Sequence, residues 1–245
     1  MPKSPQAFQS ELRDMLEELR PHGLSYYHPL INGDVETREQ LEAWCRSFYI
    51  RDVAVLLARA FAKCPHLDAR RFIAENLYEE EGKFRPGMSH PELSMRLPKY
   101  FGMTEEQIEA GYRGRTQSPA AQARARAHEQ MSWIDEFAGF GLGAEYYAPA
   151  VFGMIADKLL GQFGLPKDVL EFFYVHLYED EDHARRTMEI VAKYADSDEK
   201  QHQVVETIKR NVLSNYAGYM GSSKAKRLPE PVVAELRRRA SVSER

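Results

Sequence analysis

The chain has few cysteines and no long apolar run. Only Cys45 and Cys64 occur among its 245 residues, too few for a disulfide framework, and this suits a reducing compartment. No stretch reaches eighteen consecutive apolar residues, and the N-terminus shows no apolar segment of the signal-peptide kind. We therefore expect a cytoplasmic protein with no membrane partner.

A positive charge excess and a strand pattern are also missing. The formal net charge is −4 at pH 7, which argues against nucleic acid as a partner. The one basic run lies after residue 220, and we interpret residues 221–245 as a basic C-terminal tail that is solvated or frayed. Alternating β-branched runs are absent, which excludes folds built on a sheet.

Helical periodicity is what the sequence does contain, with clear signals where helices begin. Ser4 and Pro5 predict a helix to about Leu19, and Thr37 with Gln40 predicts a capping box that opens a helix to about Lys63. The same reasoning predicts further helices over about 68–82, from 91, from 104, over 118–140, 144–163, 168–194 and 198–220. Residues 1–220 are therefore predicted to form one all-α bundle of seven or eight helices.

The most distinctive motif is His176, Asp180 and His183 in the stretch HLYEDEDH. Offsets of four and seven place the three side chains on one stripe of a helix, where two imidazoles and a carboxylate form a donor set for a transition metal. The alternative is a charged, solvated helix face, which the neighbouring acidic residues also fit.

A second candidate is the run Glu79, Glu80 and Glu81, followed by His90 beyond a loop. Three glutamates at the C-terminal end of a helix oppose the helix dipole, and a stability cost without structural return indicates function. One of them, facing inward with Asn76, is expected to be a ligand, and we assign Glu80 because it lies two residues before Gly82. The alternative, which we accept for the other two glutamates, is that they form an acidic cluster at the surface.

The third candidate is Glu145, which lies in the apolar and aromatic stretch FGLGAEYYAPAVF. A carboxylate in such surroundings is costly to desolvate unless it is paired or bound to a metal. A partly exposed glutamate at a helix start is the alternative. Together the three groups supply carboxylates and histidines on several helices, a combination that suits paired irons handling oxygen better than structural zinc.

These residues resemble the haem-oxygenase-like diiron oxidases. The likeness rests on the order Glu80, His90, Glu145 and then the His-x3-Asp-x2-His triplet, and it extends over most of the chain. The long segment SFYIRDVAVLLARAFAKCP and the phrase KYADSDEKQ are similar to pyrroloquinoline-quinone synthase and to the chlamydial para-aminobenzoate synthase, which are related proteins.

The resemblance implies a single haem-oxygenase-like bundle, often a homodimer. Glu80, His90, Glu145, His176, Asp180 and His183 would hold two iron ions, with dioxygen as co-substrate. The expected enzyme is an oxidoreductase that oxidises a small carboxylate-bearing metabolite, derived from an amino acid or a fatty acid, by N-oxygenation, desaturation or C–C cleavage. Its expected role is the biosynthesis of a specialised metabolite or cofactor.

Three alternatives stay open at this point. A metal-free oxidase of the quinone-synthase kind would work without iron, although His176 and Glu80 depart from that enzyme's pattern. A non-catalytic interaction protein could use the same fold. A thiaminase-like hydrolase would require Cys45 or Cys64 as a reactive nucleophile, whereas both fit an apolar helix face better. Manganese in place of iron is also compatible with these ligands.

Overall fold

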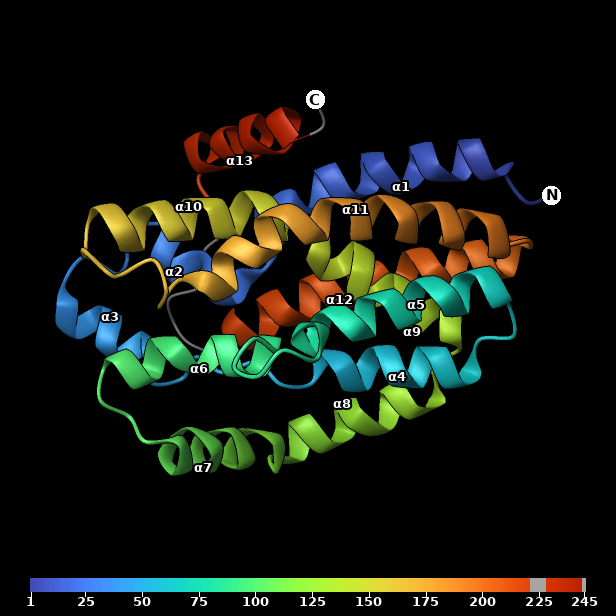
Figure 1. The fold of residues 1–245 in the computed structure, drawn as a ribbon. Coiled ribbons are helices and arrows are strands. Elements are labelled where there is room, and N and C mark those ends of the chain that lie inside the picture. The colour runs from blue at the N-terminus through green and yellow to red at the C-terminus, as the bar shows by residue number, and fades with distance from the viewer. Residues whose placement is uncertain (221–227, 244–245) are drawn as a thin grey trace. The chain divides into compact units, whose positions relative to one another are not determined.

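The computed structural model describes the backbone of residues 1–220 and 228–243. Side chains are described throughout these ranges except at 120, 178–181, 214–220 and 242–243. The described chain is helical and contains no strand, which confirms the predicted all-α class (Figure 1). The helices are α1 (Pro5–Leu19), α2 (His28–Ile31), α3 (Arg38–Cys45), α4 (Val53–Lys63), α5 (Leu67–Glu80), α6 (His90–Tyr100), α7 (Glu105–Thr116), α8 (Pro119–Gln130), α9 (Trp133–Phe140), α10 (Ala148–Gly161), α11 (Glu171–Tyr194), α12 (Asp198–Met220) and α13 (Glu230–Ser243).

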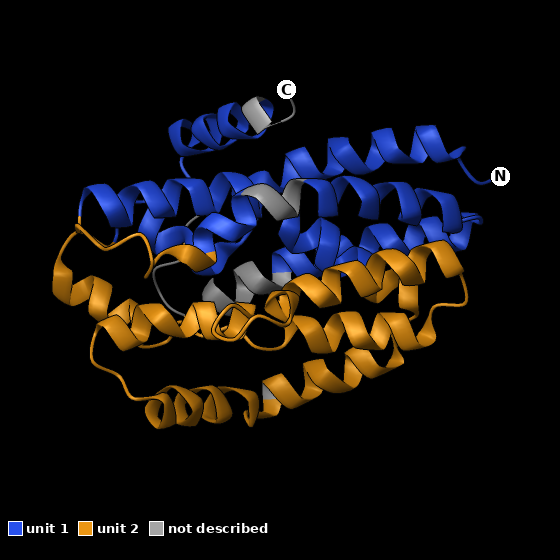
Figure 2. Cartoon of the chain, in the orientation of Figure 1, with its two compact units in different colours: residues 1–34, 137–162, 173–245 blue, residues 35–136, 163–172 orange. Residues whose placement is uncertain are grey.

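The chain divides into two compact units built from interleaved segments (Figure 2). Unit 1 comprises residues 1–34, 137–162 and 173–245, and unit 2 comprises residues 35–136 and 163–172. The sequence predicted one domain over residues 1–220, without this division. None of the described helices is both long enough and apolar enough to cross a membrane.

In unit 1, α10 packs against α2 and α13, and α1 packs against α12. The contact side of α1 is apolar because Phe8, Leu12 and Leu16 recur at helical spacing and are fully buried. Ser4 caps α1 by accepting a hydrogen bond from the backbone N–H of Ala7, and Pro5 occupies the first turn, as predicted.

In unit 2, α4 packs against α5, while α6 contacts α3 and α7. The capping boxes predicted at Thr37 and Thr104 are both present and begin α3 and α7. A third box at Ser89 and Glu92 begins α6. These side chains satisfy backbone donors at helix starts that would otherwise lack a partner.

The single helix predicted from Thr37 to Lys63 is wrong, because the chain breaks after Cys45 and resumes at Val53. The break is stabilised from outside the helix. The Ser94 hydroxyl accepts a hydrogen bond from the Ile50 N–H at 3.2 Å, and its own proton can go to the carbonyl oxygen of Pro91 at 2.9 Å or of Ile50 at 3.3 Å. Phe48 is buried within the break.

Two further expectations differ from the structure. The helix predicted over 118–140 is divided into α8 and α9, because the Ser132 hydroxyl accepts from the Asp135 N–H and starts a new helix. The basic tail expected after residue 220 contains α13, whose Val233 and Leu236 are buried. Its basic residues lie on the other faces of an amphipathic helix, which is why the charge pattern alone indicated a solvated tail.

Candidate metal centre

Among the three consecutive glutamates, Glu80 is the buried one. The buried positions of α5 are Ala69, Phe72, Ile73, Asn76 and Glu80, which follow a helical repeat. Glu79 is partly exposed and lies 3.6 Å from the ammonium of Lys83, and Glu81 is exposed. Helical geometry therefore turns Glu80 inward and leaves its neighbours at the surface.

A tight loop carries the chain from Glu80 to His90. Gly82 adopts a φ of 62°, and a Cβ at this position would lie 2.3 Å from the carbonyl carbon of Met88. Only glycine fits such a left-handed residue against passing backbone. The loop brings the Nδ1 of His90 to 3.0 Å from a carboxylate oxygen of Glu80, and both side chains are buried.

Glu145 ends a π-helical segment, Gly141–Glu145, that continues α9. The sequence predicted that the helix breaks at Gly141 and Gly143. The chain instead stays helical and changes from the α-helical to the wider π-helical form. The two glycines allow close packing instead, since a Cβ at Gly141 would lie 2.7 Å from the Thr187 hydroxyl oxygen, and one at Gly143 would lie 3.0 Å from Asn211 Nδ2. Such π-helical turns occur frequently at functional sites, and Glu145 is buried here.

Helix α11 supplies His176 and His183, which are both buried. The Nδ1 of His183 lies 3.5 Å from a carboxylate oxygen of Glu145. The ring of Phe152 meets the His176 ring edge-on at 5.2 Å between centroids and limits its rotation. The predicted ligand Asp180 lies outside the described side chains.

The residues directly after Glu145 take part in a polar network that the sequence analysis did not predict. The buried Arg20 donates through Nε to Glu17 at 2.9 Å and lies over the rings of Tyr146 and Tyr147, and Tyr146 donates its hydroxyl proton to Glu17 at 2.8 Å. Desolvation acts to raise the pKa of Glu17, but the hydrogen bonds and charge of Arg20 outweigh it and lower that pKa. The spacing of Glu17 and Arg20 on one helix face was the available signal.

Both cysteines are buried, and burial raises the pKa of the Cys45 and Cys64 thiols. A raised pKa disfavours the thiolate, which is the nucleophilic form. The structure therefore gives no support to a cysteine-dependent hydrolase.

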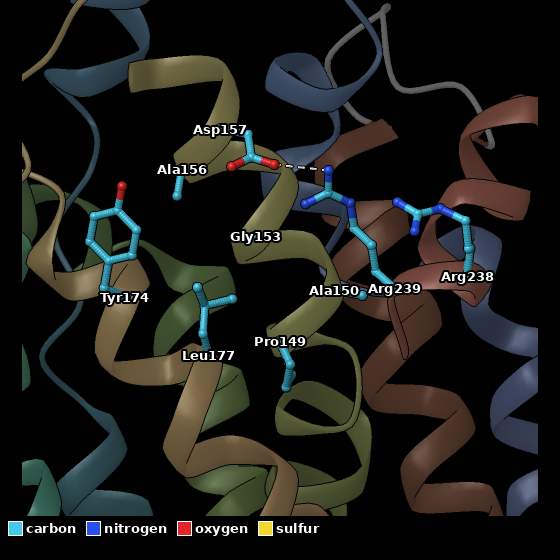
Figure 3. Close-up of a pocket in the computed structure, with 9 residues that line it drawn as sticks. All are labelled: Pro149, Ala150, Gly153, Ala156, Asp157, Tyr174, Leu177, Arg238 and Arg239. Atoms are coloured by element: carbon cyan, nitrogen blue, oxygen red, sulfur yellow. Dashed lines mark ion pairs between the residues drawn. The ribbon is translucent and has the colours of Figure 1, made fainter. Parts of the chain in front are cut away.

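Unit 1 also has an open groove of about 400 Å³ between α10, α11 and α13 (Figure 3). Ala150, Gly153 and Ala156 line it on α10, and Tyr174 lines it on α11. On the α13 side Arg239 is paired with Asp157 at 2.9 Å. None of the predicted metal ligands whose side chains are described lines this groove.

The donor set fits iron chemically. Unit 2 holds a buried carboxylate–imidazole pair, Glu80 with His90, and unit 1 holds a second, Glu145 with His183. Buried carboxylates and imidazoles are costly unless they are paired or bind a metal, and oxygen and nitrogen donors of this kind suit iron. The absence of thiolate donors among them is unlike the commonest structural zinc sites.

Comparison with known proteins agrees with this chemistry. A family model described as an iron-containing redox enzyme matches residues 44–216. The 4-aminobenzoate synthase of Chlamydia muridarum (strain MoPn / Nigg) is 26% identical over 207 residues, covering 80% of this chain and 81% of that protein. The protein of the same name from Chlamydia trachomatis serovar D is 27% identical over 177 residues, covering 68% and 71%.

The match to the family model spans well over half of the chain and includes every predicted ligand position. The helical fold and the resemblance noted from the sequence agree with it. The protein belongs to the haem-oxygenase-like family of iron-containing redox enzymes and is an oxidoreductase.

Proposed function

We propose that this protein is a non-haem diiron oxidase that uses dioxygen to oxidise a small carboxylate-bearing metabolite in a biosynthetic pathway. The observation that carries the proposal is the presence of two buried carboxylate–imidazole pairs, at 3.0 Å and 3.5 Å. Both pairs consist of residues that the sequence predicts to be metal ligands. The family and the chlamydial relatives support an oxidase-type role in biosynthesis.

In this proposal the ligands are those assigned from the sequence: Glu80, His90, Glu145, His176, Asp180 and His183. Bound iron would supply the electrons that reduce dioxygen. The protein's part is to present carboxylate and imidazole donors from packed helical elements. The capping box at the start of α6 fixes His90, and the close packing of Gly141 on Thr187 fixes the segment that carries Glu145.

Burial and aromatic packing exclude water from these donors. Phe172 approaches the ring of His90 edge-on at 6.2 Å, and Phe152 does the same for His176 at 5.2 Å. A dry surrounding strengthens the interaction of a carboxylate with a cation. It also protects a reactive oxidising site from side reactions with solvent.

A carboxylate-bearing substrate would need a cationic anchor, but Arg51 and Arg185, which lie on the chain near the proposed ligands, are already paired with carboxylates of the protein. Arg51 pairs with Glu109 at 2.9 Å, and Arg185 pairs with Glu189 at 2.7 Å. Both arginines are exposed. Surface ion pairs of this kind are the ordinary role of such residues, and we assign neither of them to substrate.

The test is dioxygen uptake by the anaerobically prepared, iron-loaded protein, followed with an oxygen electrode and by visible absorption. The proposal predicts rapid uptake with a new absorption band, both lost in His176→Ala. Substrates are then screened among amino acids and fatty acids, with formation of 4-aminobenzoate monitored because of the chlamydial relatives. Failure of the iron-loaded wild type to consume dioxygen, with or without these compounds, would contradict the proposal.

A further inference from the structure

Asn76 is a buried amide without hydrogen-bond partners. Its side chain lies on α5 with an exposed fraction of 1%, and neither Oδ1 nor Nδ2 has a partner among the described residues. Leaving a buried polar group unsatisfied costs roughly 1–3 kcal/mol. Asparagine is in addition a weaker helix former than leucine or methionine. Asn76 therefore lowers the stability of the fold both through its unsatisfied amide and through its low helix propensity.

The position of Asn76 relates it to Glu80. The two residues are four apart on α5, so their side chains lie on the same face one turn apart. Apart from these two, the buried positions of α5 are Ala69, Phe72 and Ile73, which are apolar. A leucine at position 76 would continue that apolar face and remove the penalty.

A structural reason for the amide is not found in its surroundings. Asparagine within a helix commonly hydrogen-bonds nearby backbone, and Asn76 makes no such bond in the described chain. Glu80, by contrast, already contacts His90 through Oε2. A carboxylate that binds a metal through one oxygen leaves lone pairs that an outer partner normally satisfies.

We propose that Asn76 is a positioning residue that donates a hydrogen bond from Nδ2 to the carboxylate of Glu80 when the metal is bound. This inference rests on the proposed function, because it gives Asn76 a partner only in the metal-bound protein. An asparagine at this position then lowers the stability of the metal-free chain and in return orients a metal ligand. Outer partners of this kind change metal affinity by about 10–100-fold when removed.

The experiment measures two quantities for each variant: the denaturation midpoint of the metal-free protein, and the dissociation constant for Fe²⁺ by anaerobic competition with a chelator. Asn76→Leu should raise the midpoint and weaken Fe²⁺ binding about 10–100-fold. Asn76→Ser, whose hydroxyl can still donate, should bind Fe²⁺ more tightly than Asn76→Leu. These opposite movements distinguish a positioning role from a general loss of structure.

Asn32→Leu is the matched control. Asn32 also has a buried side-chain oxygen without a hydrogen-bond partner among the described residues, but it directly follows α2 in unit 1 and lies far in sequence from the predicted ligands. Its replacement should leave Fe²⁺ affinity unchanged. Wild-type affinity in Asn76→Leu would overturn the inference while leaving the diiron proposal standing, whereas absence of Fe²⁺ binding in the wild type would overturn both.

Discussion

Glu136 is a buried carboxylate that unit 2 neutralises with its own cations. It accepts a hydrogen bond from the Nε of Arg59 at 2.7 Å, and the Lys63 ammonium lies 3.5 Å from its other oxygen. Lys63 also donates to the carbonyl oxygen of Met131 at 2.9 Å, just beyond the end of α8. One acidic side chain therefore connects α4, α8 and α9.

We predict that Glu136→Gln destabilises the protein by about 2–3 kcal/mol, because it leaves the guanidinium of Arg59 without its counter-charge. Urea unfolding at neutral pH measures the change. Glu42→Gln is the control, since Glu42 pairs with Arg46 at the surface and should contribute less than about 0.5 kcal/mol. Equal effects of the two substitutions would show that the buried cluster has no special importance.

The pair of Glu17 and Arg20 gives a prediction for pH. The folded pKa of Glu17 lies below its ordinary value of 4.5, so this group stabilises the fold above that pH and loses its contribution as pH falls through the folded pKa. The difference in unfolding free energy between wild type and Glu17→Gln should therefore be constant at pH values well above 4.5 and should narrow as the pH falls below 4.5. Urea unfolding across this range measures the gap, and one that widens on acidification would contradict the assignment.

Some roles of single residues could be predicted from the sequence and others could not. Glu80 was assigned from its position two residues before Gly82, and the structure agrees, because Glu80 continues the helical repeat of buried positions on α5. The partnership of Arg20 with Tyr146 could not follow in the same way, since it joins residues more than a hundred positions apart. Such contacts depend on side-chain directions set by the tertiary fold.

At the scale of elements, the loop between Glu80 and His90 depends on Gly82. Gly82→Ala would combine the strain of a left-handed residue, about 1–2 kcal/mol, with a clash against the backbone at Met88. We predict a loss of stability clearly larger than that strain alone, together with weaker iron binding, because His90 would move away from Glu80. Urea unfolding and iron content measure the two effects.

Gly87→Ala provides the matched control for this loop. Gly87 also has a positive φ, 77°, but a Cβ there would meet nothing within 4 Å. It should show only the conformational strain and retain iron. If Gly82→Ala behaved like Gly87→Ala, the close approach of the loop to Met88 would have no energetic importance.

Three helix caps were predicted correctly, whereas the starts predicted at 144 and 168 lie a few residues early and the helix interruptions were predicted poorly. The caps at Ser4, Thr37 and Thr104 are local, since each side chain satisfies a backbone group three residues away. The interruption after Cys45 depends on Ser94, and the π-helical segment depends on packing against Thr187. Both are tertiary effects that override local propensity, so periodicity could not reveal them.

At the scale of the whole chain, α13 is part of the packed structure of unit 1. It contacts α10, and its Leu236 is buried although the surrounding sequence is strongly basic. We predict that Leu236→Ala lowers the free energy of unfolding by about 2–4 kcal/mol, as for other buried leucines. Denaturant unfolding followed by circular dichroism measures this change.

Leu213→Ala is the comparison, because Leu213 on α12 in the same unit is exposed. It should cost well under 1 kcal/mol. A frayed tail, as the sequence alone suggested, would make the two substitutions equivalent. The unequal result would place residues 230–243 within the cooperative fold.

The fold class and the family were both predictable from the sequence because both depend on patterns carried by many residues. Helical periodicity runs through most of the chain, and the order of Glu80, Glu145 and the α11 histidines carries the family likeness. The division into two units was not predictable, since it depends on which segments pack together rather than on any local signal. Substrate specificity could not be predicted from the sequence either, because it depends on the shape of a cavity.

The central claim is that the buried glutamates and histidines bind iron, and counting iron tests it most directly. We would load metal-free protein with Fe²⁺ under anaerobic conditions, remove excess metal, and measure iron per chain for the wild type, Glu80→Ala and Glu79→Ala. The account predicts close to two irons per chain in the wild type and in Glu79→Ala, whose side chain lies partly exposed on the same helix, and a clear loss in Glu80→Ala. A wild type that retains no iron, or a Glu80→Ala variant that retains as much as the wild type, would contradict it.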